Sequence, residues 1–219
     1  MTSLAQGFAV IEECRTESEC DAIITELETV SGAGTRCLLD NEWCQSLATS
    51  LKKQLAATIP DISPLVAVQC TFFNKSPTSN WFVAYHQDRS IPVSSSVSAT
   101  DWSGWSQKEG MTFVHGPDEV LAQMIAVRLH VDDCTQNNGP LRVIPGSHLT
   151  GTLSPQDIAV LRESSDEQPL LVGKGGVVVM QPLLLHASSK SNTIENRCVL
   201  HFLFGPPTLP TGLEWRRAV

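Results

Sequence analysis

The chain has 219 residues, 42% of them hydrophobic and 17% charged, and a formal net charge of −8. This length fits one large domain, and the composition excludes a disordered chain, a collagen and a coiled coil. The acidic balance, without a long run of lysine and arginine, excludes nucleic acid as a partner. Nothing in the sequence indicates an oligomeric state.

Membrane segments and disulfides are also not indicated. The apolar runs 175–180 and 183–185 are separated by Gln181 and Pro182, and neither approaches the ~20 residues that span a bilayer. The first residues lack a basic stretch followed by a long apolar one, so a cytoplasmic protein without a secretory signal is expected. Seven cysteines without a CxxC pair are expected to be buried, reduced thiols.

Residues 1–63 have the periodicity of two helices. Between residues 18 and 30, apolar side chains recur at three- and four-residue spacing, and the Ser-Gly-Ala-Gly run at 31–34 predicts the end of this helix. Between residues 41 and 59, leucines form one stripe, and Pro60 ends the element. We interpret these helices as scaffold.

From residue 64 onward, short β-like runs predominate, each bounded by Gly, Pro, Asn or Ser. Asn138-Gly139 predicts a tight turn that connects the strand ending near Asp133 to the strand starting at Leu141. Ser154-Pro155 predicts the start of a short helix. The pattern favours a β-sandwich or barrel, with strands at 65–73, 81–85, 124–131, 141–144, 176–180 and 197–204.

Residues 89–110 are rich in serine, show little periodicity and contain Trp102 and Trp105. A long irregular segment of this kind is typical of a lid or a binding loop. The alternative is an insertion that exposes two tryptophans at the surface.

Two His-x-Asp pairs are candidate metal ligands, His86 with Asp88 and His130 with Asp132. Residues two apart in a strand point to the same face, so either pair could direct an imidazole and a carboxylate to one point. A triad of two histidines and one carboxylate, which suits Fe(II), needs one more histidine from a distant strand. His186, which follows a buried apolar run, is that candidate.

Arg197 lies eleven positions after His186, at the start of a predicted strand. An arginine inside a barrel needs a carboxylate to neutralise it, and a dicarboxylic cosubstrate would supply one. The alternative is a surface arginine flanked by Glu195.

Together these segments resemble the phytanoyl-CoA dioxygenase family of Fe(II)- and 2-oxoglutarate-dependent oxygenases, especially its shorter bacterial members. The resemblance covers residues 66–204 and rests on the order and spacing of four motifs. They are Phe73-Asn-Lys75, His-Gln-Asp at 86–88, Asn-Gly-Pro-Leu-Arg-Val-Ile-Pro-Gly-Ser-His at 138–148, and His186-Ala-Ser188 followed by Arg197.

The resemblance implies His86, Asp88 and His186 as the iron ligands. It leaves His130 and Asp132 as structural residues, because their segment corresponds to an ordinary strand in the family. The implied cofactors are Fe(II), 2-oxoglutarate and O2, with ascorbate as a potential stimulant.

The same resemblance implies the cosubstrate contacts. Arg197 would pair with the distal carboxylate of 2-oxoglutarate, and Ser188 and Lys75 would assist its binding. Gln69 matches a pocket position more loosely.

Substrate contacts are less defined by the sequence. Tyr85 is interpreted as an aromatic wall of the pocket, the alternative being a redox-sensitive phenol near iron. Arg128 shares a strand face with His130 and Asp132; this face lies either in the cavity, where Arg128 would anchor the substrate, or in solvent, which the residues alone favour. The candidate substrate-binding residues are Tyr85, Trp102, Trp105 and Arg128, and the histidines interpreted as structural are His115, His148 and His201.

The implied fold is a double-stranded β-helix, mainly β and jelly-roll-like, with residues 1–219 as one domain. Residues 64–219 would form the barrel, residues 1–63 a helical scaffold packed on it, and residues 89–110 an insertion. The implied reaction hydroxylates an unactivated C–H bond of a small organic molecule and converts 2-oxoglutarate and O2 to succinate and CO2. A free small molecule is favoured over a coenzyme A thioester because no basic cluster suited to its phosphates is seen.

Two alternatives of other classes remain. A zinc-dependent hydrolase could use the same His, Asp and His ligands with a metal-bound water as nucleophile, but it leaves Arg197 unexplained. A non-catalytic small-molecule-binding barrel would be expected to have lost a ligand.

Overall fold

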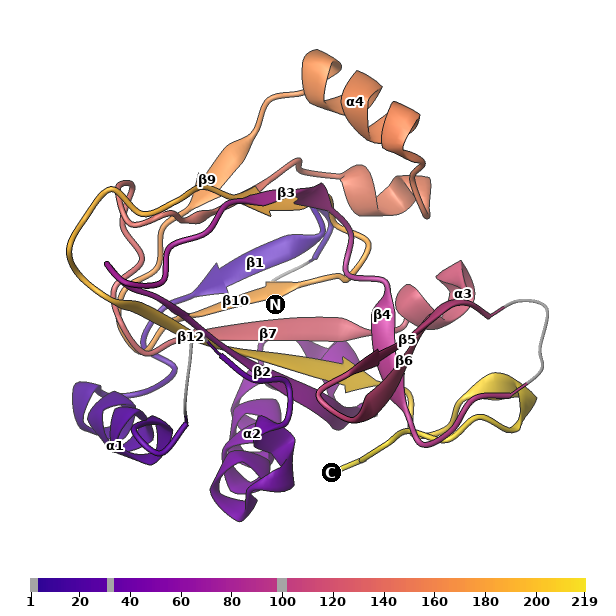
Figure 1. Ribbon diagram of the computed structural model, residues 1–219, viewed down its shortest axis with the longest axis horizontal. Coiled ribbons are helices and arrows are strands. Elements are labelled where there is room, and N and C mark those ends of the chain that lie inside the picture. Colours follow the sequence, from indigo (N-terminus) through magenta and orange to yellow (C-terminus); the bar gives the residue numbers. More distant parts are fainter. Residues whose placement is uncertain (1–3, 31–33, 98–101) are drawn as a thin grey trace.

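The structure is a computed structural model that describes residues 4–30, 34–97 and 102–219. Its helices, which mostly lie outside the sheets (Figure 1), are α1 (Glu17–Leu27), α2 (Glu42–Leu55), α3 (Asp118–Leu121) and α4 (Pro155–Ser164). Its strands are β1 (Phe8–Ile11), β2 (Val66–Lys75), β3 (Val83–His86), β4 (Ser90–Val93), β5 (Ser103–Lys108), β6 (Met111–His115), β7 (Ile125–His130), β8 (Leu141–Val143), β9 (Gln168–Leu170), β10 (Val177–Met180), β11 (His186–Ser188) and β12 (Arg197–Gly205).

Two antiparallel sheets form the body of the molecule. The larger sheet has the strand order β1-β10-β7-β12-β2, and the smaller has the order β3-β11-β8-β9. They lie one above the other in Figure 1, and the small sheet β4-β6-β5 lies towards one end of the larger one. The arrangement confirms the predicted double-stranded β-helix.

The strands of the larger sheet divide their side chains between two faces. On β7, Val127 and Leu129 pack in the core under the helices, whereas the alternating Arg128 and His130 point into the barrel. β12 alternates in the same way and is buried throughout its length. Because both faces of these central strands are covered, the polar side chains on the inner face are removed from bulk water.

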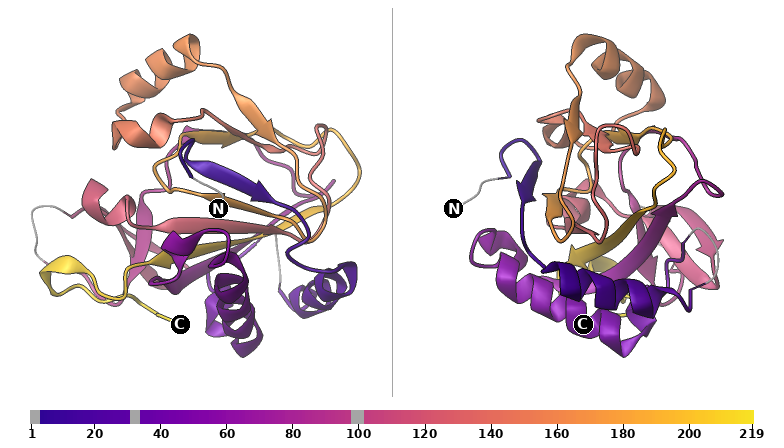
Figure 2. Two further views of the ribbon diagram at one scale, coloured as in Figure 1. Left: turned by 180° about the vertical axis from the view of Figure 1, so that it is seen from behind. Right: turned by 90° about the vertical axis from the view of Figure 1, so that its left-hand side faces the viewer.

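Helices α1 and α2 cover the outer face of the larger sheet (Figure 2). α1 begins with a capping box between Thr16 and Glu19, and α2 buries a stripe that includes Leu51 and Leu55. Both predicted helices are confirmed, with shorter ends. Residues 31–33 of the predicted terminating run lie outside the described residues. No helix in the described parts of the chain is long and apolar enough to cross a membrane.

All six predicted strands are present, but two expectations about the rest of the chain were wrong. The segment 1–63 is not purely helical, because β1 pairs with β10 at the edge of the larger sheet. The segment 89–110 is not irregular: it contains β4 and β5, although residues 98–101 lie outside the described part. All seven cysteines are free thiols, as expected, and all but Cys37 are buried.

The predicted turn at Asn138-Gly139 lies on the connection from β7 to β8. The connection crosses between sheets, because β7 belongs to the larger sheet and β8 to the smaller one. Asn138 stabilises the crossover: its side-chain oxygen accepts from the Thr135 backbone and its amide donates to the Asp133 carbonyl. Gly139 has φ +75°, a conformation that glycine adopts without strain.

Candidate metal centre and pocket

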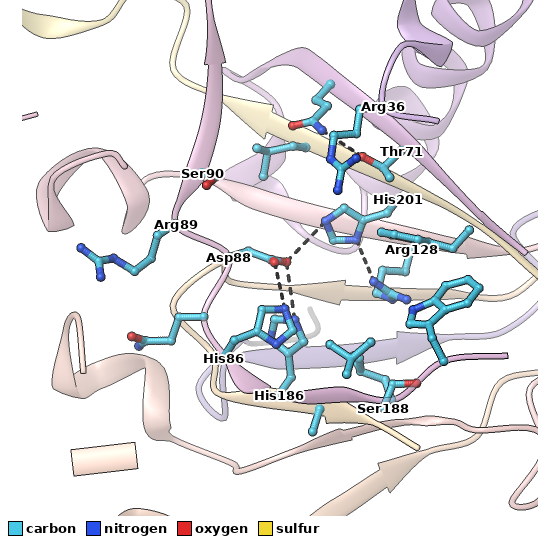
Figure 3. Close-up of a pocket in the computed structure, with 18 of the residues that line it drawn as sticks. Arg36, Thr71, His86, Asp88, Arg89, Ser90, Arg128, His186, Ser188 and His201 are labelled. Atoms are coloured by element: carbon cyan, nitrogen blue, oxygen red, sulfur yellow. Dashed lines mark hydrogen bonds and ion pairs between the residues drawn. The ribbon is translucent and has the colours of Figure 1, made fainter. Parts of the chain in front are cut away.

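A pocket of about 350 Å³ lies inside the barrel and is shown in Figure 3. One wall is the inner face of β2, where every second residue from position 69 to position 75 lines the pocket, and the opposite wall includes β3 and β11. The residues of β2 on this wall are Gln69, Thr71, Phe73 and Lys75. The pocket is therefore bounded by strands of both sheets.

Pairing of β3 with β11 brings His86 and His186 together. These residues are direct partners in the antiparallel register, and their ring centroids lie 4.2 Å apart. Asp88 follows β3, where its backbone N–H donates to the Pro182 carbonyl at 2.8 Å. One strand pair thus brings together two histidines that are 100 positions apart in the sequence.

The carboxylate of Asp88 lies among three imidazoles. Its Oδ1 is 3.5 Å from His86 Nε2, and its Oδ2 is 3.6 Å from His186 Nε2 and 3.5 Å from His201 Nε2. In Figure 3, His86 and His186 approach Asp88 from one side and His201 from the other. Candidate ligand atoms of His86, Asp88 and His186 all lie within 4.8 Å of one another, so these three residues could hold one shared cation.

Backbone carbonyls set the orientation of the two paired imidazoles. His86 Nδ1 lies 2.9 Å from the Ala84 carbonyl, and His186 Nδ1 lies 2.7 Å from the Leu184 carbonyl. A carbonyl accepts only, so each Nδ1 holds a proton and each Nε2 faces Asp88 as the atom that could bind a metal. Burial lowers the pKa of His186 to about 4, against the opposing effect of Asp88, so this ring is neutral and able to bind a metal.

In His201 the two ring nitrogens have the opposite roles to those in His86 and His186. The sequence analysis interpreted His201 as structural and missed its place beside Asp88. Arg128 Nη1 donates to His201 Nδ1 at 3.1 Å, so the proton of the neutral ring lies on Nε2 and faces Asp88. Burial, together with Arg128, lowers the pKa of His201 to about 3. His201 is thus placed to donate to the carboxylate instead of offering it a lone pair.

Lys75 and Arg197 form a second polar group in the pocket, and they are direct partners between β2 and β12. Lys75 Nζ donates to Ser188 Oγ at 2.7 Å and to the Ser189 carbonyl. Arg197 is buried, and its Nε and Nη1 have no hydrogen-bond partner among the described residues. Since buried guanidinium donors without a partner are costly, this end of the pocket fits a carboxylate ligand.

Mutual repulsion of cations adds to burial at this end. Burial, then Arg197 and Arg128, lowers the pKa of Lys75 to about 7. Burial and Arg197 lower the pKa of Arg128 to about 10. A bound dianion would relieve both effects.

The inner face of β7 resolves the alternatives left by the sequence. Arg128 lines the pocket, and both Arg128 and His130 are buried. The expectation of a solvent-facing edge was therefore wrong. Neither ring nitrogen of His130 has a partner in the described structure. Asp132 turns away from the centre and accepts a hydrogen bond from the Cys198 backbone at 3.0 Å. This second His-x-Asp pair therefore does not converge on one point.

Three predicted substrate contacts lie outside the pocket. Tyr85 alternates with His86 along β3, so it faces away from the centre; it donates to Glu167, and its ring is covered by Arg142 and Arg162. Trp102 is buried in the apolar cluster beside the small sheet and donates to Thr211 Oγ1 at 2.9 Å. Trp105 packs against the same cluster. Neither tryptophan closes over the metal centre.

The other predicted pocket residues are found in its lining. Gln69 is there and donates to Thr71 Oγ1 at 2.9 Å. Ser188, besides accepting from Lys75, donates to the Gly139 carbonyl at 2.9 Å, so the crossover after β7 supports this end of the pocket.

The fold and the centre together define a double-stranded β-helix protein with two histidines and one carboxylate arranged around a single candidate metal position. The phytanoyl-CoA dioxygenase family matches residues 4–197. This chain therefore belongs to that family.

Among characterised relatives, the L-proline trans-4-hydroxylase of Streptomyces griseoviridis is 26% identical over 129 residues. The match covers 47% of this chain and 48% of that protein. It thus spans about half the length of this relative.

Solved structures share the fold at low sequence identity. Iron-bound HygX from Streptomyces hygroscopicus has a TM-score of 0.65 at 18% identity, covering 92% of this chain and 83% of that one. AviO1 from Streptomyces viridochromogenes Tue57 has a TM-score of 0.64 at 20% identity, covering 94% and 92%. The non-heme α-ketoglutarate-dependent carbocyclase SnoK from nogalamycin biosynthesis has a TM-score of 0.65 at 15% identity, covering 95% and 85%.

Proposed function

We propose that this chain is a non-haem iron(II)- and 2-oxoglutarate-dependent oxygenase that acts on a small organic molecule. The observation that carries the proposal is the convergence of His86, Asp88 and His186 within 4.8 Å, beside the buried and unpaired Arg197. The first group fits a divalent cation and the second fits an anionic cosubstrate. Family membership supports the same conclusion.

The donor atoms fit iron(II). Two neutral imidazoles and one carboxylate on one side of a cation form the facial triad that leaves coordination positions open to other molecules. His86 and His186 would bind through Nε2, since their Nδ1 atoms face carbonyls, and Asp88 would bind through its carboxylate. His201 would hold that carboxylate in place by donating from Nε2.

The cosubstrate would lie with its distal carboxylate at Arg197, assisted by Lys75 and Ser188. Arg197 supports this assignment because it presents two free donors in this chain; a HygX structure holds nickel and 2-oxoglutarate. Gln69 would contribute a polar contact farther along β2. Arg128, which faces the metal position, would contact the substrate or the cosubstrate.

Bound iron would supply oxidation of a C–H bond by O2, in which R–H, 2-oxoglutarate and O2 give R–OH, succinate and CO2. The protein's own residues would position the reactants and keep the centre dry: β7 and β12 close the pocket floor with buried strands. The relatives named as hydroxylase and carbocyclase are consistent with oxidation as the shared chemistry.

The zinc hydrolase alternative uses the same three ligands but assigns no role to the cations at the far end of the pocket. Arg197 and Lys75 are paired in register and buried in the barrel. A hydrolytic water at the metal would not neutralise them, whereas a dicarboxylate would.

Succinate formation from 2-oxoglutarate tests the proposal. Protein reconstituted with Fe(II) is expected to release succinate slowly even without a substrate, and Asp88→Ala is expected to lose this activity with its iron binding. His130→Ala, the corresponding change in the second His-x-Asp pair, is the control and is expected to retain much of it. Tight zinc binding without succinate release would support the hydrolase instead, and equal loss in both variants would show that the ligand set is wrong.

A further inference from the structure

Positive charge is concentrated in the pocket of an otherwise acidic protein. The chain has 15 lysines and arginines and a net charge of −8, yet six of these cations line the pocket, with Asp88 as the single carboxylate in its lining. The six are Arg36, Lys75, Arg89, Lys108, Arg128 and Arg197. Iron would add positive charge and 2-oxoglutarate two negative charges, so the loaded pocket would remain cationic.

The cations occupy two separate places. Lys75 and Arg197 pair at one end of the β2–β12 ladder, and His201 pairs with Thr71 four residues along β2. At about 3.3 Å per residue this is a separation of ~13 Å. The candidate metal position lies at the level of His201, so the region beside Thr71 lies next to it and apart from the cosubstrate end.

Arg36 and Lys108 are the cations at the second location, near Thr71. The Thr35 carbonyl accepts from the Phe72 backbone at 2.8 Å, which holds Arg36 beside Thr71, and Figure 3 shows the Arg36 side chain directed towards His201. Lys108, on β5, lies with Nζ 5.0 Å from the centre of the Phe113 ring. Burial and then Arg36 lower the pKa of Lys108, so the two cations are close enough to repel each other.

Their neutralisation by protein groups is incomplete. Arg36 pairs with Glu109 at 2.9 Å, whereas no ion pair joins Lys108 to a carboxylate in the described residues. Arg89 also lines the pocket without such a pair, although its side chain points away from Asp88 in Figure 3. A positive site thus remains at the substrate side of the pocket.

We propose that the substrate carries an anionic group, a carboxylate or a phosphate, which binds at Arg36 and Lys108 while the carbon to be oxidised faces the metal. This inference rests on the proposed function, because it takes the Lys75–Arg197 end as occupied by 2-oxoglutarate. It also corrects the sequence analysis, in which no basic cluster was seen. The cluster is assembled from residues 72 positions apart.

Paramagnetic line broadening tests the site with defined probes. The protein is in excess over Mn(II) and is saturated with 2-oxoglutarate. It is titrated with trifluoroacetate, whose binding is monitored by its ¹⁹F resonance, or with methylphosphonate, whose binding is monitored by its ³¹P resonance. Trifluoroethanol and dimethyl methylphosphonate are the matched neutral probes. At least one anion is expected to show saturable broadening that its neutral counterpart lacks, and the two arms distinguish a carboxylate from a phosphate.

Variants locate the bound anion. The double variant Arg36→Gln/Lys108→Met is expected to raise the dissociation constant of the anion about tenfold or more, because charge-assisted hydrogen bonds are lost. Lys53→Met, which removes an exposed lysine of α2, is the control and is expected to bind like the wild type. Absence of anion binding, equal binding of neutral probes, or an unchanged constant in the double variant would overturn the proposal.

The proposed function is tested separately in the same samples. Binding of 2-oxoglutarate to the Mn(II)-loaded wild type is measured by calorimetry before any probe is added. Failure there contradicts the oxygenase, whereas 2-oxoglutarate binding followed by failure of the anion titration contradicts only the anionic substrate.

Discussion

Arg197 and Lys75 respond differently to the same buried environment. Arginine keeps its charge in proteins, so Arg197 is a permanent cation with two free donor atoms. Lys75 can release its proton, and its pKa is lowered to about 7 by burial and by the neighbouring Arg197 and Arg128. The guanidinium is therefore the fixed partner for an anion, and the ammonium is an adjustable one.

Replacement of Arg197 by leucine is expected to raise the KM for 2-oxoglutarate about tenfold to a hundredfold, because the lost hydrogen bonds to a charged group are worth ~1.5–3 kcal/mol. Succinate release as a function of 2-oxoglutarate concentration measures the effect. Arg162→Leu on the exposed α4 removes the same charge away from the pocket and serves as the control. An unaltered KM in Arg197→Leu would place this residue outside the cosubstrate site.

Titration of Lys75 predicts a pH dependence of stability in the absence of metal and cosubstrate. The unfolded chain keeps this proton up to the ordinary pKa of 10.5, whereas the folded chain releases it at about 7. Between these values the unfolded state binds more protons, so this group makes the free energy of unfolding increase with pH.

Urea unfolding of the wild type and Lys75→Met at several pH values measures this effect. The wild type is expected to gain stability relative to Lys75→Met as the pH rises from about 7 towards 10. Lys53→Met controls for the general loss of one positive charge. A difference between wild type and Lys75→Met that stays constant with pH would show that Lys75 does not titrate in this window.

Single residues illustrate what a sequence pattern leaves open. Alternation along a strand correctly grouped Arg128 with His130, but it did not say which face was inward, since the answer depends on α1 and α2 covering the other face. The same limit applies to Tyr85, which neighbours His86 and therefore faces away from the pocket. His201 was missed because its role depends on register with Arg128 across two strands.

At the scale of elements, the crossover between β7 and β8 supports the end of the pocket where Lys75 and Ser188 lie. A Cβ at Gly139 would collide with the Ser189 carbonyl and come 3.2 Å from Lys75 Nζ. Gly110, in the turn between β5 and β6, has nearly the same φ, +74°, but open space around it. Alanine substitutions at Gly110 and Gly139 therefore separate the cost of backbone strain from the cost of steric contact.

Gly110→Ala is expected to cost about 1 kcal/mol of unfolding free energy from the backbone conformation alone. Gly139→Ala is expected to cost ~2–4 kcal/mol and to raise the KM for 2-oxoglutarate, since Lys75 must move. Denaturant unfolding and succinate release are the measurements. Similar stability losses with no change in KM would mean that the crossover does not position Lys75.

Elements differed in how well the sequence predicted them. Buried strands such as β7 and β12 were predicted because their apolar runs are continuous and bounded by turn residues. β4 and β5 were not, because Pro92 and the serine-rich composition weaken the local strand signal, and their stability comes from pairing with β6. The turn at Asn138-Gly139 was predicted correctly, but the sequence did not show that it crosses between two sheets, since sheet membership is not a local property.

At the scale of the whole molecule, the net charge of the chain did not reveal that the pocket is lined by cations. The net charge of −8 is a sum over the whole chain, whereas the barrel gathers cations from β2, β5, β7 and β12 around one cavity. The family resemblance, with its widely spaced motifs, pointed to the candidate metal position and to the proposed cosubstrate end. The cations of the proposed substrate site required the folded structure, because Arg36 and Lys108 belong to no shared motif.

Anomalous diffraction at the iron edge, from crystals grown anaerobically with Fe(II) and 2-oxoglutarate, tests whether His86, Asp88 and His186 bind iron. One peak is expected between Nε2 of His86, Nε2 of His186 and the Asp88 carboxylate, with His201 beyond bonding distance and electron density for the cosubstrate reaching Arg197. A peak at another position, or an iron position that excludes His186, would contradict the account.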